Sequence, residues 1–226
     1  SMIAERSDWC ISRQRTWGVW SVPDKEVAAS VDASPWQVAP HLSEQIYTME
    51  DALLFAGMMM NFLKYADRIK IACQSLLTNI SAAIMTKEEG EVWVQPIYYP
   101  FMHMANYGSG KVLQGVDEIP AYDCALRKQV PYVDYVVVHN EEKKEVVLFA
   151  VNRMEGEMAE IALELQGFEA VRVIEHVTMH SLDKKATNLE NHERVKPEQS
   201  DTSSLAQGVL TSRLPALSWN MVRIAI

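Results

Sequence analysis

Pairs of neighbouring carboxylates are the first feature of this 226-residue sequence that suggests catalysis. Two carboxyl groups held close together can act as the general acid and base of a hydrolase. Such pairs occur at Glu88-Glu89 with Glu91, at Asp117-Glu118 and at Glu141-Glu142. Each pair lies in a polar segment that is typical of a turn, so we interpret all three as solvated faces.

Two histidines and a glycine-rich segment are the other candidates for metal or phosphate binding. His176 and His180 are four residues apart in a strand-like pattern, which places them about 13 Å apart on one side, too far for one metal ion. The segment from Gly108 to Lys111 lacks the spacing of a phosphate-binding loop and fits a helix end followed by a linker. We therefore predict no metal site and no cofactor, and place both histidines at the surface or inside a sandwich.

Composition and charge exclude several classes of protein. The chain is 48% hydrophobic and 23% charged, with a net charge of −9, so it has no basic field for nucleic acid or anionic lipid. The apolar run 52–60 is too short to cross a membrane, and Ser1–Arg6 has no apolar signal region. The sequence therefore favours a cytoplasmic globular protein that does not bind nucleic acid or membranes.

Cysteine usage agrees with a reducing compartment. Cys10, Cys73 and Cys124 are odd in number and irregularly spaced, which suits neither a disulfide framework nor a Cys-x-x-Cys metal site. We predict reduced, mostly buried thiols.

The first half of the chain has helical and strand signals. Thr48 and Asp51 have capping-box spacing, and the apolar residues that follow predict a helix over 49–65. The run 69–73 predicts a buried strand. Pro100 fits the first turn of a second helix that ends at Tyr107-Gly108.

From about residue 111 the hydrophobic pattern changes to period two. Runs over 132–139 and 145–152 flank a charged turn and predict a hairpin. Further strand patterns cover 158–165, 171–180 and 217–226, while the polar segment 188–204 predicts a long surface loop. The second half therefore predicts a β-sandwich or barrel of jelly-roll type.

Ordered blocks of residues over about 18–226 resemble the C-terminal part of α-L-arabinofuranosidases of glycoside hydrolase family 51. These blocks include Trp36–Leu42, Ile46–Leu53, Ala66–Cys73, Ile84–Thr86, Trp93–Phe101, Tyr107–Gly110, Phe149–Arg153, Glu175-His176 and Leu217–Asn220. The resemblance implies an α/β plus all-β fold, in which the last βα units of a (β/α)8 barrel (18–112) precede a jelly-roll-type β-sandwich (113–226).

The resemblance also implies that this chain lacks both catalytic carboxylates. Family members are retaining hydrolases about twice this length, with a nucleophile and an acid/base about 5–5.5 Å apart. The acid/base belongs to an upstream part of the barrel. The nucleophile motif has the form Asp-Glu-Trp-x-Val-Trp, and this chain has Thr16 at the glutamate position of the matching stretch Arg15–Trp20.

A second resemblance accounts for that departure. Met2–Val19 resembles a block of isoleucyl-tRNA synthetases but has neither signature loop of those enzymes, so it is not expected to bind ATP, amino acid or tRNA. We interpret residues 1–17 as a foreign leader joined to the arabinofuranosidase-like sequence near Trp17–Val19.

The family resemblance marks two residues as substrate-binding. Trp20 matches a tryptophan whose ring lies beside the sugar, and Gln95 matches a glutamine at the rim of the sugar pocket. An aromatic face packs on the C–H side of a sugar and an amide bonds its hydroxyls. The simpler alternatives are that Trp20 is a core residue and that Gln95 caps a strand end.

The leading hypothesis is therefore the C-terminal portion of an α-L-arabinofuranosidase, inactive as this chain. Its parent would act on arabinofuranoside-containing saccharides and could form a homo-oligomer. One alternative is a non-catalytic sugar-binding or interaction module built on the sandwich, which would bind its ligand through an exposed aromatic such as Tyr132 or Tyr135. The other is an unstable truncated product.

Overall fold

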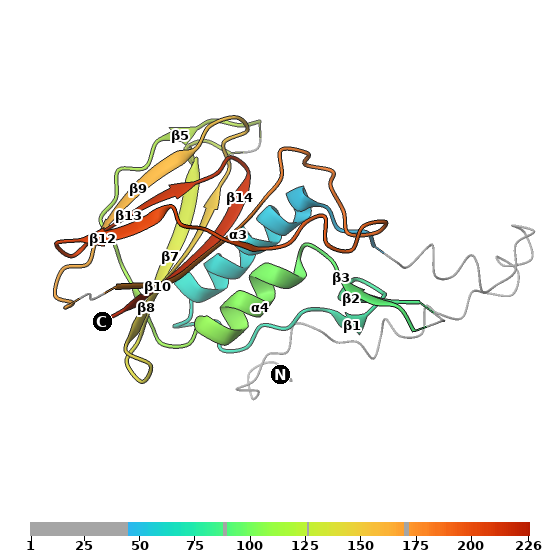
Figure 1. Ribbon diagram of the computed structural model, residues 1–226, viewed down its shortest axis with the longest axis horizontal. Coiled ribbons are helices and arrows are strands. Elements are labelled where there is room, and N and C mark those ends of the chain that lie inside the picture. The colour runs from blue at the N-terminus through green and yellow to red at the C-terminus, as the bar shows by residue number, and fades with distance from the viewer. Residues whose placement is uncertain (1–44, 88–89, 126, 170–171) are drawn as a thin grey trace, which may run out of the picture.

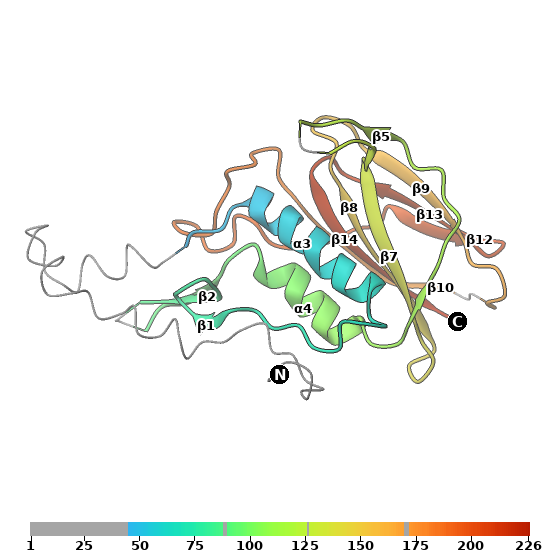
Figure 2. The ribbon, with the colours of Figure 1, turned by 180° about the vertical axis from the view of Figure 1, so that it is seen from behind.

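The fold has three layers: two helices, a large sheet and a smaller sheet (Figure 1). The computed structural model describes residues 45–87, 90–125, 127–169 and 172–226. Figure 2 shows the same layers from behind, with the helices on one face of the large sheet and the smaller sheet on the other.

The first helix, α3 (Met49–Lys64), begins at the predicted capping box. The Thr48 hydroxyl accepts a hydrogen bond from the Asp51 backbone N–H at 3.2 Å, and the Asp51 carboxylate accepts one from the Thr48 N–H at 2.8 Å. These bonds satisfy donors that a helix start leaves unpaired. The predicted helix over 49–65 is confirmed.

The second helix, α4 (Tyr98–Tyr107), also lies where it was predicted, with Gly108 at its C-cap. Gly110 has a φ of 139°, and an added Cβ there would overlap the His139 carbonyl, so only glycine fits this close approach. Lys111 then begins a strand. The segment from Gly108 to Lys111 is therefore a helix end and linker, as predicted.

The large sheet has six strands in the order β11-β10-β14-β8-β7-β4, and all of its neighbouring pairs are antiparallel. Its strands are β4 (Lys111–Leu113), β7 (Val133–Asn140), β8 (Glu145–Asn152), β10 (Arg172–His180), β11 (Glu198–Gln199) and β14 (Ser218–Ala225). The predicted hairpin is the pair β7–β8, in which Val133 lies opposite Asn152 and Asn140 opposite Glu145.

Three smaller sheets complete the described strands. The second layer of the sandwich has the order β12-β13-β9, and two short sheets have the orders β1-β2-β3 and β5-β6. Their strands are β1 (Leu76–Thr78), β2 (Ala82–Thr86), β3 (Val92–Val94), β5 (Ala121–Tyr122), β6 (Val130–Pro131), β9 (Ala159–Glu164), β12 (Ser203–Ala206) and β13 (Val209–Leu214).

Alternation along the central strand β8 divides the hydrophobic interior into two clusters. Val146, Leu148 and Ala150 face the smaller sheet, where they pack with residues of β9 and β13. Val147 and Phe149 face the opposite way, toward α3 and α4. Because successive side chains of a strand point to opposite faces, one strand serves both clusters.

The helix-facing cluster joins the two halves of the sequence. Met49, Ala56 and Met60 of α3 and Met104 of α4 are buried with residues of β7, β8, β10 and β14. The predicted division between residues 112 and 113 therefore falls between segments that share one core. A (β/α)8 barrel including residues 18–112 stays a prediction about a longer protein.

Trp219 of β14 lies at the centre of the helix-facing cluster and is fully buried. Its indole N–H donates to the Nδ1 of His103 on α4 at 3.0 Å, and its ring stacks on Phe149 with centroids 5.7 Å apart. This contact ties α4 to the middle of the large sheet.

Two predicted elements differ from the structure. Residues 69–73 are not a strand, because no strand of the described residues pairs with them and an apolar run needs a partner to form a ladder. The segment 188–204 is not simply a surface loop: it contains β11 and the start of β12, and Asn188 and Val195 are buried.

The buried turn of that segment is built around one amide. The Asn188 side chain donates to the Val94 and Val195 carbonyls at 3.0 and 2.9 Å and accepts from the Val195 N–H at 2.8 Å. A polar residue therefore lies inside because its hydrogen bonds are all made. Hydrophilic composition alone predicted the opposite.

Candidate functional site

Gln95 follows β3 directly and is almost fully buried, with 2% of its surface exposed. Its side-chain oxygen accepts a hydrogen bond from the Tyr47 backbone N–H at 2.8 Å. Its side-chain nitrogen donates to the carbonyls of Gln45 at 2.9 Å and Ala82 at 2.8 Å. The amide thus joins three chain segments and has both N–H groups engaged, an arrangement that matches a strand-end cap.

Replacing Gln95 with alanine is expected to destabilise the chain by about 2 kcal/mol, because a part-buried N–H at Tyr47 and two carbonyls lose their partner. Urea unfolding monitored by circular dichroism measures the loss. Gln166→Ala is the matched control, since Gln166 is exposed and bonds only Glu164, two residues away. Equal unfolding free energies for the two variants would contradict a structural role for the Gln95 amide.

Trp20, the other predicted substrate-binding residue, and Thr16 lie outside the described residues. The substrate-binding roles of Trp20 and Gln95 therefore stay predictions from the family resemblance.

The described residues of the acidic clusters are exposed, as predicted, while Glu88 and Glu89 lie outside the described residues. Glu91 pairs with Lys87 at 2.8 Å and Glu141 with Lys111 at 2.6 Å, and each lysine lowers the pKa of its partner carboxyl. Asp117 accepts a hydrogen bond from the Tyr135 hydroxyl at 2.7 Å. Burial and this carboxylate together raise the pKa of Tyr135 to about 12.

The two histidines also lie where the sequence placed them. His176 is buried between the sheets, where its Nδ1 lies 2.8 Å from the Ser203 hydroxyl, and burial lowers its pKa. His180 is exposed at the end of β10. In the part of the chain that the structure describes, no three His, Cys, Asp or Glu side chains gather as metal ligands.

The two described cysteines differ from the prediction of mostly buried thiols. Cys73 and Cys124 are both exposed. Cys73 belongs to the run 69–73 that forms no strand, so the burial expected from strand packing is absent there. Cys10 lies outside the described residues.

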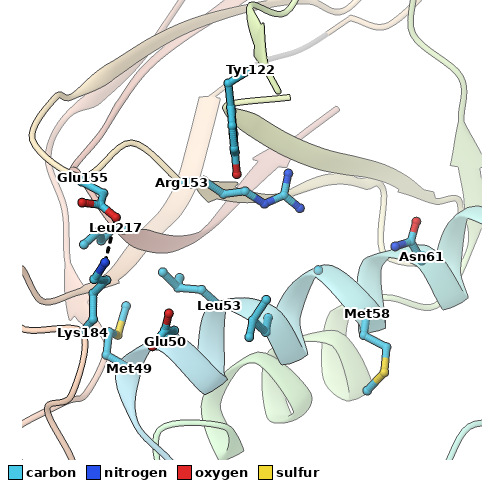
Figure 3. A pocket seen from close by; sticks show the side chains of 12 residues that line it. Met49, Glu50, Leu53, Met58, Asn61, Tyr122, Arg153, Glu155, Lys184 and Leu217 are labelled. Atoms are coloured by element: carbon cyan, nitrogen blue, oxygen red, sulfur yellow. Dashed lines mark hydrogen bonds and ion pairs between the residues drawn. The ribbon is translucent and has the colours of Figure 1, made fainter. Parts of the chain in front are cut away.

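A pocket of about 420 Å³ lies between α3 and the loops at one end of the large sheet (Figure 3). Leu53, Met58 and Asn61 of α3 line one side, and Tyr122 and Arg153 line the other. These residues are far apart in the sequence, and only the packing of α3 on the sheet brings them together. No motif therefore signalled the pocket.

Ion pairs surround the pocket. Lys184 lies 2.7 Å from Glu155, and Arg153 lies 2.8 Å from Asp134. Asp134 also accepts a hydrogen bond from Lys64 near the end of α3 at 2.6 Å. The Arg153 guanidinium lies over α3, where a Cβ added at Gly57 would be 3.4 Å from its Nη2, an ordinary van der Waals contact.

The arrangement of sheets and helices defines the class of fold. The class is a two-sheet β-sandwich with helices packed on one outer face. Part of the catalytic domain of a family GH30 xylanase C from Talaromyces cellulolyticus superposes on this fold with a TM-score of 0.57 at 15% identity, over 78% of this chain and 35% of that one.

The family is shown by the sequence. The model of the alpha-L-arabinofuranosidase C-terminal domain matches residues 17–218. This chain belongs to that family.

Curated relatives agree with this assignment. The chain is 43% identical over 208 residues to the intracellular exo-alpha-(1->5)-L-arabinofuranosidase of Halalkalibacterium halodurans. This match covers 92% of this chain and 41% of the relative. It is 42% identical over 211 residues to the corresponding enzyme 1 of Bacillus subtilis, with the same two coverages. The chain thus spans about two fifths of the length of these relatives.

Solved structures agree as well. A family 51 alpha-L-arabinofuranosidase from Bifidobacterium longum superposes with a TM-score of 0.76 at 32% identity, over 82% of this chain and 37% of that one. Separately, 19 residues, 8% of this chain, are 90% identical to 2% of the isoleucine–tRNA ligase of Mycoplasmoides gallisepticum. Neither helix of the described residues is long and apolar enough to span a membrane.

Proposed function

We propose that this chain is the C-terminal portion of a retaining α-L-arabinofuranosidase that hydrolyses terminal α-L-arabinofuranosyl linkages in polysaccharides or oligosaccharides. The match to family relatives along 92% of the chain supports this proposal most directly. The names of those relatives also support an intracellular location and an arabinose-containing substrate.

In this proposal the described residues support the catalytic part and do not perform the chemistry themselves. The sandwich and α3 form one packed unit through the helix-facing cluster, and a barrel built on residues 18–112 would rest on that unit. Trp20 and Gln95 would form one wall of the sugar pocket in the complete enzyme. Residues 1–17 would be a leader of different origin, which has no part in the reaction.

The 226-residue chain by itself is expected to release no arabinose. Retaining hydrolysis needs one carboxylate to attack the anomeric carbon and a second to protonate the leaving oxygen. Thr16 stands where the family resemblance requires the first, and a threonine hydroxyl with no activating base is a poor nucleophile. The measurement is arabinose release from α-1,5-linked arabinotriose, with the Bacillus subtilis enzyme as the active reference.

A chimera tests the positive part of the proposal. Residues 21–226 of this chain would replace the matching C-terminal part of the Bacillus subtilis enzyme, which keeps its own upstream sequence. We expect this chimera to release arabinose. A folded chimera without activity, or a 226-residue chain with activity, would contradict the proposal.

A non-catalytic sugar-binding module is the second candidate function. The pocket beside α3 favours it, since that pocket is formed entirely by the described residues of this chain. The two functions are compatible, because the pocket needs neither catalytic carboxylate.

A further inference from the structure

We propose that the pocket between α3 and the loops carrying Tyr122, Arg153 and Lys184 is a non-catalytic binding site for a neutral oligosaccharide. The choice of arabinose as the sugar rests on the proposed function. The inference of a neutral, hydroxyl-rich ligand rests on the pocket itself (Figure 3).

The size and lining of the pocket fit a short saccharide. Its volume of about 420 Å³ falls within the range of small-molecule sites. Leu53, Met58 and Leu217 provide apolar surface, while Tyr122 and Asn61 add an aromatic ring and an amide. A sugar has apolar C–H faces and polar hydroxyl edges, so it matches a lining of this mixed kind.

Two uncharged polar groups of the pocket are unengaged. Within the described part of the chain, neither the Tyr122 hydroxyl nor the Asn61 side-chain amide makes a hydrogen bond. In Figure 3 the Tyr122 hydroxyl points toward the space between Arg153 and α3, and the Asn61 amide points toward it from the helix. One hydroxyl and one amide together offer both donors and acceptors, which is what sugar hydroxyls require.

The charges of the pocket are already balanced, and this balance selects the charge of the ligand. Lys184 pairs with Glu155, Lys185 with Glu50, and Arg153 with Asp134. An anionic ligand would have to compete with these carboxylates for the cations, and a cationic ligand would have to displace the lysines. A neutral ligand leaves all three pairs intact and can hydrogen-bond to their outer oxygen atoms.

The position of Tyr122 suits a platform for a sugar face. Tyr122 belongs to the two-residue strand β5, which pairs with β6, and its ring packs on Tyr132 with centroids 4.9 Å apart. Tyr132 therefore supports one side of the ring. An aromatic side chain held in this way can bind a ligand without first losing its own freedom.

The experiment is a titration of the 226-residue chain with α-1,5-linked arabinotriose, followed by ¹⁵N-resolved NMR shifts and by calorimetry. We expect saturable binding with shifts that centre on α3 and on the segments around Tyr122 and Arg153. Tyr122→Ala should weaken binding about tenfold, and Asn61→Ala about fivefold. Arabinonate, the anionic sugar acid, is expected to bind more weakly than arabinotriose.

The matched control is Tyr65→Ala, because Tyr65 is an exposed tyrosine just after α3 that does not line the pocket. This variant should bind as the unchanged chain does. The proposal is overturned if the chain binds no arabinotriose at millimolar concentration, if both pocket variants keep full affinity, or if Tyr65→Ala weakens binding equally. Because the titration measures no hydrolysis, its failure is distinct from inactivity of the chimera.

Discussion

Replacing Trp219 with alanine is expected to lower the free energy of unfolding by about 3–5 kcal/mol, the range for removing a buried tryptophan. The Trp219 side chain is fully buried and lies among residues of both helices and four strands of the large sheet. Its loss also leaves the Nδ1 of His103 without the 3.0 Å hydrogen bond that it accepts. Urea unfolding of the two proteins measures the difference.

Trp219→Phe separates the ring from its hydrogen bond. Phenylalanine can keep the stacking on Phe149 but cannot donate to His103, so we expect a loss of about 1–2 kcal/mol. Leu182→Ala is the surface control, since 69% of Leu182 is exposed, and it should have little effect. A Trp219→Ala variant as stable as Leu182→Ala would show that α4 is not held by this cluster.

The sequence predicted elements whose signals are local. The capping box at Thr48 and Asp51 fixes the start of α3 through two short-range hydrogen bonds, and the charged turn between residues 139 and 145 fixes the β7–β8 hairpin. Both signals depend on residues close together in the chain. For this reason both elements could be predicted from the sequence alone.

Elements that depend on distant partners were missed. The run 69–73 has the composition of a strand but no partner among the described strands, whereas the polar segment 188–204 includes a two-residue strand because β10 offers an edge. Gln95 also has distant partners, because three backbone groups from other segments engage its amide. Its substrate-binding role, assigned from the family resemblance, stays a prediction. The pocket at Arg153 likewise exists only once α3 packs on the sheet.

Acid is expected to destabilise this fold through His103. Burial in the helix-facing cluster lowers the pKa of His103 from 6.5 to about 4, although the charge of Glu175 raises it slightly. The Trp219 N–H donates to Nδ1, so the neutral ring keeps its own proton on Nε2, and protonation would place a second donor against the indole. The native state therefore favours neutral His103.

The direction of the pH effect follows from that difference in pKa. Between about pH 6.5 and pH 4 the unfolded chain binds more protons at this site than the folded chain, so stability falls as the pH falls. The full contribution is present above pH 6.5, and about 3 kcal/mol is lost by pH 4. His176, whose pKa burial also lowers, adds to the same decline.

A His103→Leu variant isolates the contribution of His103 from that of His176 and the carboxylates. The variant loses the Trp219 hydrogen bond, so its stability is lower above pH 6.5, but its decline between pH 6.5 and 4 should be smaller than that of the unchanged chain by about 3 kcal/mol. The difference in stability between the two proteins should therefore shrink or reverse as the pH falls to 4. Urea titrations at four pH values across the window measure both slopes. Parallel slopes would mean that His103 becomes protonated without disturbing the contact between α4 and β14, and the anchoring role assigned to the buried His103–Trp219 pair would then be wrong.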